Sequence, residues 1–132
     1  MNKEPMDVVR EYINAFNAAD TEGMAAMFAA SGSILDGTAP HIWQGPNVAR
    51  DWYRDVLVKG EQIGAGNYLV ELDEPLRNHI TGDSAYVVLP ASIKFTVKGE
   101  QIVQPGAMFV VALRRLAEGW RIVSWAWAKG KQ

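Results

Sequence analysis

The spacing of the apolar residues changes once along this chain, near residues 60–66, and that change limits the folds open to it. Before it, apolar residues recur at helical spacing, and after it they alternate as in β-strands. Helices followed by strands indicate an α+β fold. The chain has 132 residues and no internal repeat or low-complexity linker, so we expect a single domain over 1–132.

Three helices are predicted before the change. Pro5 suits the first position of a helix, and the apolar positions that follow share one helical face; they are Val9, Tyr12, Ile13 and Phe16. Asp20 can cap a second helix that turns Phe28 inward. Pro46 can open a third helix, which Gly60 can close.

Between the second and third helices, residues 31–36 are predicted as a short strand ended by Asp36-Gly37, a turn pair, and residues 37–45 as a loop. Further strands follow over 67–73, 76–81, 84–98, 101–116 and 120–128; the second is shorter and can continue the ribbon of the first after a kink at Pro75. Pro105-Gly106 interrupts one of them, and because proline lacks the ladder donor we expect a bulge or bend there. The predicted fold is a cone-shaped half-barrel, with N-terminal helices packed on a strongly bent antiparallel sheet around a pocket.

Composition excludes several kinds of function. The formal net charge is −2 and no basic patch is visible, so nucleic-acid or anionic-membrane binding lacks its electrostatic basis. There is no cysteine, and the two histidines, His41 and His79, lie far apart in sequence. We therefore predict no metal and no cofactor. No apolar run approaches membrane-spanning length and no secretory signal is visible, so we expect a cytoplasmic protein without membrane association.

Asp36 and Tyr12 are the candidate catalytic residues. Asp36 follows a strand and precedes a glycine, so it can point into the cone, where a carboxylate could move a proton beside a carbonyl. The alternative is an ordinary turn aspartate. Tyr12 lies on the apolar face of the first helix, and its hydroxyl could donate to a substrate oxygen. The alternative there is a core tyrosine bonded to Tyr53 or to a backbone carbonyl.

Ten residues are candidates for lining a ligand pocket, and most are aromatic; they are Phe16, Phe28, His41, Trp43, Trp52, Tyr53, Ala107, Phe109, Trp125 and Trp127. The alternative is that such a set forms an ordinary core. His41 lies in the predicted loop beside Trp43, where it could rim the pocket, whereas His79 shares strand parity with polar neighbours. A histidine acid or base is conceivable at either position.

Several motifs have counterparts in one superfamily. Val-Val-Arg-Glu-Tyr at 8–12, Asn-Ala-Ala-Asp at 17–20, Met-Phe-Ala at 27–29, Asp36 and Arg-Asp-Trp-Tyr at 50–53 fall where ketosteroid isomerases have like residues. Gly-Trp-Arg-Ile-Val-Ser-Trp at 119–125 is similar to the closing strand of SnoaL-like domains. The chain as a whole thus resembles the nuclear transport factor 2-like superfamily, and its residue pattern resembles ketosteroid isomerases most.

The resemblance implies roles for individual residues. It makes Tyr12 an oxyanion-hole donor, Asp36 the general base and Tyr53 a supporting tyrosine. One position departs from the pattern: Ala107 stands where ketosteroid isomerases have a second, protonated aspartate, so half of the oxyanion hole is missing. The acid/base aspartate that SnoaL-like cyclases carry on a late strand has no counterpart in 120–128.

Two functions remain open from the sequence. The first is binding of a small apolar or aromatic carbonyl compound, with cofactor-free acid–base turnover by Asp36 and Tyr12 of the isomerase, cyclase or dehydratase type. The second is a non-catalytic ligand carrier or dimeric interaction module with a vestigial cavity. We also expect a homodimer formed by the outer sheet faces, to which the tryptophan-rich last strands contribute, because helices can cover only one face of the sheet.

Overall fold

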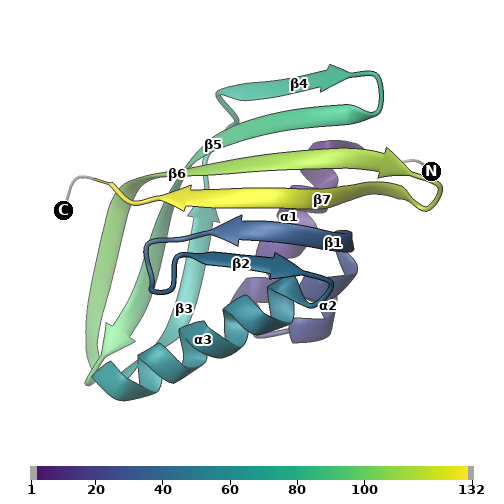
Figure 1. The fold of residues 1–132 in the computed structure, drawn as a ribbon. Coiled ribbons are helices and arrows are strands. Elements are labelled where there is room, and N and C mark those ends of the chain that lie inside the picture. The colour runs from purple at the N-terminus through teal and green to yellow at the C-terminus, as the bar shows by residue number, and fades with distance from the viewer. Residues whose placement is uncertain (1–2, 131–132) are drawn as a thin grey trace.

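The computed structural model describes residues 3–130, in which three helices lie against one side of a seven-stranded sheet (Figure 1). The helices are α1 (Pro5–Asn17), α2 (Thr21–Ala26) and α3 (Val48–Ile63). The strands are β1 (Phe28–Leu35), β2 (Ile42–Gly45), β3 (Ala65–Leu72), β4 (Arg77–Thr81), β5 (Ser84–Val97), β6 (Glu100–Leu116) and β7 (Gly119–Ala128). The α+β fold predicted from the sequence is confirmed. No helix within residues 3–130 is long and apolar enough to cross a membrane.

The sheet is mixed, which corrects the prediction of an antiparallel one. Its order is β2-β1-β7-β6-β5-β3, and β4 pairs with β5 beyond the end of β3, so β3 and β4 form the expected ribbon. β1 and β7 run parallel, with Ile34 beside Trp125, and the other pairs are antiparallel. Because parallel strands end at the same edge of a sheet, the residue after β1, Asp36, comes to the end of β7.

The bend in the sheet arises where the sequence predicts it. Between Ala91 and Ile93 of β5 the pairing with β6 shifts from Ala107 to Gln104, so β6 holds an extra residue at Pro105-Gly106. Gly106 has φ 77°, a left-handed conformation that suits glycine at a bulge. The part of β5 that follows the bulge and the part of β6 that precedes it turn downward in Figure 1, toward the end of α3. The sheet therefore wraps around the helices and leaves an open cone.

The predicted third helix ends later than expected. α3 continues through Gly60 to Ile63, and Gly64, with φ 72°, takes the left-handed position that ends it. Gly60 has a packing role instead: a Cβ there would lie 2.6 Å from the Tyr68 hydroxyl oxygen. The added residues 61–63 carry Ile63 along the cone. β2 is also absent from the prediction, because only four residues lie between flanking turn signals.

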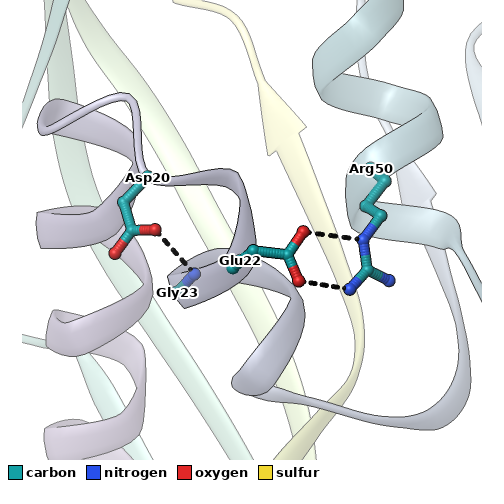
Figure 2. A network of polar contacts seen from close by, with 4 residues as sticks. All are labelled: Asp20, Glu22, Gly23 and Arg50. Carbon is teal, nitrogen blue, oxygen red and sulfur yellow. Dashed lines mark hydrogen bonds and ion pairs between the residues drawn. The ribbon is translucent and has the colours of Figure 1, made fainter.

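Two polar contacts fix the short helix α2 (Figure 2). The Asp20 carboxylate accepts a hydrogen bond from the Gly23 backbone N–H at 3.0 Å, which confirms Asp20 as its cap. Arg50 of α3 donates to both oxygens of Glu22, from Nε at 3.1 Å and from a terminal nitrogen at 2.7 Å. This bidentate pair is exposed, so it orients α2 against α3 and adds little stability.

Asn17 joins the end of α1 to the edge strand β3. Its side-chain oxygen accepts from the Val70 N–H at 2.7 Å, and its side-chain nitrogen donates to the Val70 carbonyl at 2.9 Å. The two bonds satisfy backbone groups that an edge strand otherwise leaves unpaired.

Replacing Asn17 with alanine is expected to destabilise the fold by about 1–3 kcal/mol, because the backbone N–H and C=O of the buried residue Val70 lose their partners. Urea unfolding measures the change as a lower midpoint at constant slope. Asn14→Ala is the matched control, since Asn14 is exposed on the same helix. Equal midpoints for the two variants would show that the Asn17 contacts contribute nothing.

Candidate functional site

A cavity of about 280 Å³ occupies the interior of the cone. α1 and α3 form one wall, and the concave side of β3, β5, β6 and β7 forms the other, with the turn after β1 at its rim. Its lining residues are Tyr12, Ile13, Phe16, Asp36, Gly37, Thr38, Trp52, Val56, Lys59, Ile63, Ala65, Tyr68, Val70, Ile93, Phe95, Gln104, Phe109, Trp125, Trp127 and Lys129. Mostly apolar walls with a few polar groups are typical of small-molecule sites.

Tyr12 occupies the closed end of the cavity, where its side chain is 1% exposed. Its hydroxyl oxygen accepts a hydrogen bond from Trp125 Nε1 at 3.0 Å. The partner is thus Trp125 of β7, not Tyr53 or a backbone carbonyl. Burial, opposed by the Trp125 bond and reinforced by the charge of Asp36, raises the pKa of Tyr12 well above its usual value. Tyr12 is therefore neutral and keeps its own O–H proton for an acceptor in the cavity.

Asp36 follows β1 and points to the same cavity, beneath α3. Its Oδ2 accepts from Trp52 Nε1 at 2.9 Å, and its Oδ1 accepts from the Gly37 N–H at 2.7 Å. Burial raises the pKa of Asp36, while Trp52, Gly37 and the charges of Lys129 and His41 act in the opposite direction. A carboxyl group that is desolvated yet held by two donors has the environment of a proton acceptor.

The cavity joins a neutral hydroxyl donor to a partly desolvated carboxylate. Tyr12 comes from α1 and Asp36 from the turn after β1, and the charge of Asp36 acts on the Tyr12 hydroxyl. Aromatic rings surround both residues. The rings of Trp52 and Trp125 pack edge to face, with their centres 4.9 Å apart. Such a pair can act on one ligand: the hydroxyl can bind an oxygen of the ligand, and the carboxylate can exchange a proton on the neighbouring atom.

Five of the proposed pocket residues line this cavity: Phe16, Trp52, Phe109, Trp125 and Trp127. Phe28 and Tyr53 do not. Phe28 begins β1 and packs edge-on against Tyr12, with ring centres 5.7 Å apart, from outside the cavity. The Tyr53 ring packs edge-on against the Phe16 ring, with ring centres 5.9 Å apart, and is not part of the cavity lining.

The loop residues His41 and Trp43 also lie outside the cavity lining. Trp43 is in β2 and is buried beneath α3, where its Nε1 donates to Asp55 at 2.8 Å. His41 is exposed, and its Nδ1 lies 3.1 Å from the backbone carbonyl oxygen of Asp36. His79 lies on β4, whose residues are all exposed. The only direct contact of these side chains with the site is that of His41 to the Asp36 backbone.

Ala107 is buried opposite Ala91 and does not reach the cavity. The bulge at Pro105-Gly106 places Gln104 in the lining instead. Sequence reasoning missed Gln104 because the bulge breaks strand alternation. It also missed Lys59, although Lys59 follows Trp52 and Val56 at helical spacing within the predicted helix. It missed Ile63 because α3 continues past Gly60.

Within residues 3–130, no group of three or more acidic or histidine side chains is placed to hold a metal ion.

Replacing Trp52 with phenylalanine is expected to raise the pKa of Asp36 further, because the change removes a hydrogen bond that favours the carboxylate. A carbon-13 NMR titration of the Asp36 carboxyl measures this without requiring turnover. Trp43→Phe is the matched control, since it removes a similar indole–carboxylate bond, to Asp55, outside the cavity. An Asp36 titration that moves equally in both variants, or in neither, would contradict the assignment.

Comparison with known proteins finds a matching family model and solved structures of the same fold. A family model described as a SnoaL-like domain matches residues 6–127. No curated protein matches the chain. Among solved structures, the chain is similar to a ketosteroid isomerase-like protein from Erwinia carotovora atroseptica, with a TM-score of 0.74 and 19% identity over 97% of this chain and 95% of that one.

Two further structures have the same fold. A nuclear transport factor 2-like superfamily protein from Salmonella enterica serovar Typhimurium has a TM-score of 0.78 and 16% identity, over 96% of this chain and 88% of that one. A nuclear transport factor 2-like protein with a cystatin-like fold from Novosphingobium aromaticivorans has a TM-score of 0.72 and 18% identity, over 93% and 77%. Identities this low show the fold alone, so the chemistry has to be inferred from the residues of the cavity.

Proposed function

Because the chain belongs to the SnoaL-like domain family, we propose that its cavity binds a flat apolar carbonyl compound and that Asp36 and Tyr12 transfer a proton at the carbon beside the carbonyl. One observation carries this proposal. The Tyr12 hydroxyl, whose oxygen already accepts from Trp125, shares the cavity with a desolvated Asp36. The confirmed likeness to ketosteroid isomerase-like proteins supports it at the level of fold.

The proton transfer needs no other reactant. Tyr12 donates its O–H to the carbonyl oxygen of the ligand, and Asp36 removes a proton from the adjacent carbon. The electron pair of that C–H bond forms the enolate, whose negative oxygen the Tyr12 hydroxyl stabilises. Asp36 then returns the proton to the same carbon or to a conjugated one, which gives exchange or isomerisation with all atoms conserved.

The surroundings of the two residues favour this step. The Trp125 N–H polarises the Tyr12 hydroxyl, so the two bonds form a cooperative chain toward the ligand oxygen. The rings of Phe16, Trp52, Phe109 and Trp125 exclude water and can face a flat ligand. A cavity of about 280 Å³ favours a ligand of one or two fused rings.

Exchange of the α-protons of 2-tetralone for deuterium, followed by proton NMR, tests the proposed function. We expect exchange that saturates with 2-tetralone and that 2-naphthol, a planar mimic of the enol, inhibits competitively. Exchange at the rate of the buffer alone, at every protein concentration, would contradict the proposed catalysis.

A non-catalytic ligand carrier is the second candidate, and Ala107 favours it. The position lies outside the cavity and offers no second donor to an oxyanion. The carrier would bind 2-naphthol without accelerating exchange of 2-tetralone, so the same experiment separates the two functions.

The outer side of the sheet is proposed to pair with a second copy of the chain. Met108, Val110 and Ala112 of β6 alternate with cavity-side residues, and Tyr86, opposite Ala112, is 49% exposed. The three helices within residues 3–130 lie on the other side of the sheet (Figure 1), so they leave this apolar outer face uncovered. Its tryptophans do not contribute as expected, because Trp120 and Trp125 are buried within the domain and Trp127 lines the cavity.

Val110→Lys is expected to convert a dimer of twice 14.6 kDa into a monomer of 14.6 kDa in light scattering, because it puts a charge in the apolar outer face. Val58→Lys adds the same charge to an exposed valine of α3 and is expected to leave the dimer intact. A monomeric unsubstituted chain at micromolar concentration would overturn the proposed pairing.

A further inference from the structure

The cavity has a closed end and an open end of different character. At the closed end lie Tyr12 and Trp125, which are 1% and 3% exposed. The described charged residues in its lining are Asp36, Lys59 and Lys129, and both lysines are exposed to solvent. A chain with a formal net charge of −2 thus places two cations, and a single carboxylate, around this cavity.

Close backbone contacts determine the position of Lys129. The next residue, Gly130, lies against the Pro105 carbonyl and Gly106 of the β6 bulge so closely that a Cβ there would clash with both. The side chain of Lys129 passes over the other rim, since a Cβ on Gly37 would lie 3.3 Å from its Cδ. The charge of the same lysine opposes the rise that burial causes in the pKa of Asp36, so the lysine lies near that carboxylate.

Lys59 approaches from the opposite wall. It belongs to the α3 stripe formed by Trp52, Val56, Lys59 and Ile63, so its stem follows the cavity while its ammonium group reaches solvent. Within residues 3–130, neither Lys59 nor Lys129 forms an ion pair, whereas Lys94, on the other face of β5, pairs with Glu71 at 2.9 Å. An anion at the open end would therefore displace no ion pair with these residues.

We propose that the ligand of this cavity carries a carboxylate on the end that faces solvent, where Lys59 and Lys129 bind it, while its oxygen-bearing ring reaches Tyr12. This inference rests on the proposed function and adds the class of ligand: an amphiphilic, flat keto or phenolic acid. Gln104, in the same lining, can donate a further hydrogen bond along the length of the ligand. The site disfavours a ligand whose exposed end is cationic.

Calorimetric titration with a matched pair of compounds tests the charge directly. The pair is 6-hydroxy-2-naphthoic acid and its methyl ester, which share the phenol and the ring system and differ in the charge at the far end. We expect the acid to bind about tenfold more tightly at low salt, the scale of two partly exposed ion pairs. High salt is expected to reduce the advantage, because screening weakens the attraction.

Lysine variants locate the effect. Lys59→Met and Lys129→Met keep the length of the stem and are each expected to weaken binding of the acid about three- to fivefold, leaving the ester unchanged. Lys94→Met removes the same charge from the outer face of β5 and is expected to change neither. Equal affinity for acid and ester, or equal effects of all three variants, would overturn this inference alone. Binding of neither compound would overturn the proposed function with it.

Discussion

Asp36→Asn is expected to slow deuterium exchange of 2-tetralone by about 10²–10⁴-fold, the usual contribution of a positioned general base. The asparagine side chain has the same shape, and its carbonyl oxygen can still accept the Trp52 N–H that Asp36 Oδ2 accepts at 2.9 Å. It cannot take the proton, and its amide nitrogen cannot accept from the Gly37 N–H as Oδ1 does, but that N–H is exposed and water can replace the lost acceptor. The substitution therefore separates basicity from packing, because the cavity walls need not move.

The binding behaviour of the same variant completes the test. Asp36→Asn is expected to bind 2-naphthol about as well as the unsubstituted chain, since Tyr12 and the aromatic walls remain. Asp73→Asn is the matched control, because it removes a carboxylate from an exposed position outside the cavity. Loss of naphthol binding together with exchange would mean that Asp36 supports the structure of the cavity. Undiminished exchange would exclude Asp36 as the base.

Tyr12→Phe is expected to slow exchange by about 10²–10³-fold, the cost of removing one donor to a developing oxyanion. It should also weaken 2-naphthol binding by about 1–3 kcal/mol through the lost hydrogen bond. The cost in this chain should lie toward the upper end, because Ala107 supplies no second donor. The variant also leaves the buried Trp125 N–H without its acceptor, so a lower urea midpoint accompanies the loss.

Tyr53→Phe distinguishes this account from the one that the sequence resemblance implies. If Tyr53 supported Tyr12, its hydroxyl would matter for exchange. The structure gives that role to Trp125, which lies 3.0 Å from the Tyr12 oxygen, while Tyr53 lies outside the cavity lining. Exchange rates are therefore expected to be equal for Tyr53→Phe and the unsubstituted chain. A loss as large as that of Tyr12→Phe would return the supporting role to Tyr53.

The main elements of the fold follow from local patterns in the sequence. The face made by Val9, Tyr12, Ile13 and Phe16 is buried as helical spacing predicts, and Pro105-Gly106 produces the expected bulge. These features depend on residues a few positions apart, so sequence spacing alone can identify them. The Asp20 cap of α2 is predictable for the same reason.

Contacts between distant segments were beyond local reasoning. Trp125 reaches Tyr12 across 113 positions, through a parallel pairing of β1 with β7 that alternation along either strand cannot show. That pairing also brings Lys129 beside Asp36, although the two residues are far apart in the sequence. Gly60 has the pattern of a helix end because glycine is common there, and local spacing does not show that the Tyr68 hydroxyl of the next strand, β3, packs against it.

A crystal structure with 2-naphthol tests the central claim most directly, because it shows whether one ligand meets both candidate catalytic residues. The account predicts the naphthol oxygen within hydrogen-bond distance of the Tyr12 hydroxyl, the ring against Phe109 and Trp125, and the Asp36 carboxylate facing a ring carbon next to the oxygen. A naphthol bound elsewhere, or seated in the cavity with its oxygen away from Tyr12 and its ring out of reach of Asp36, would contradict it.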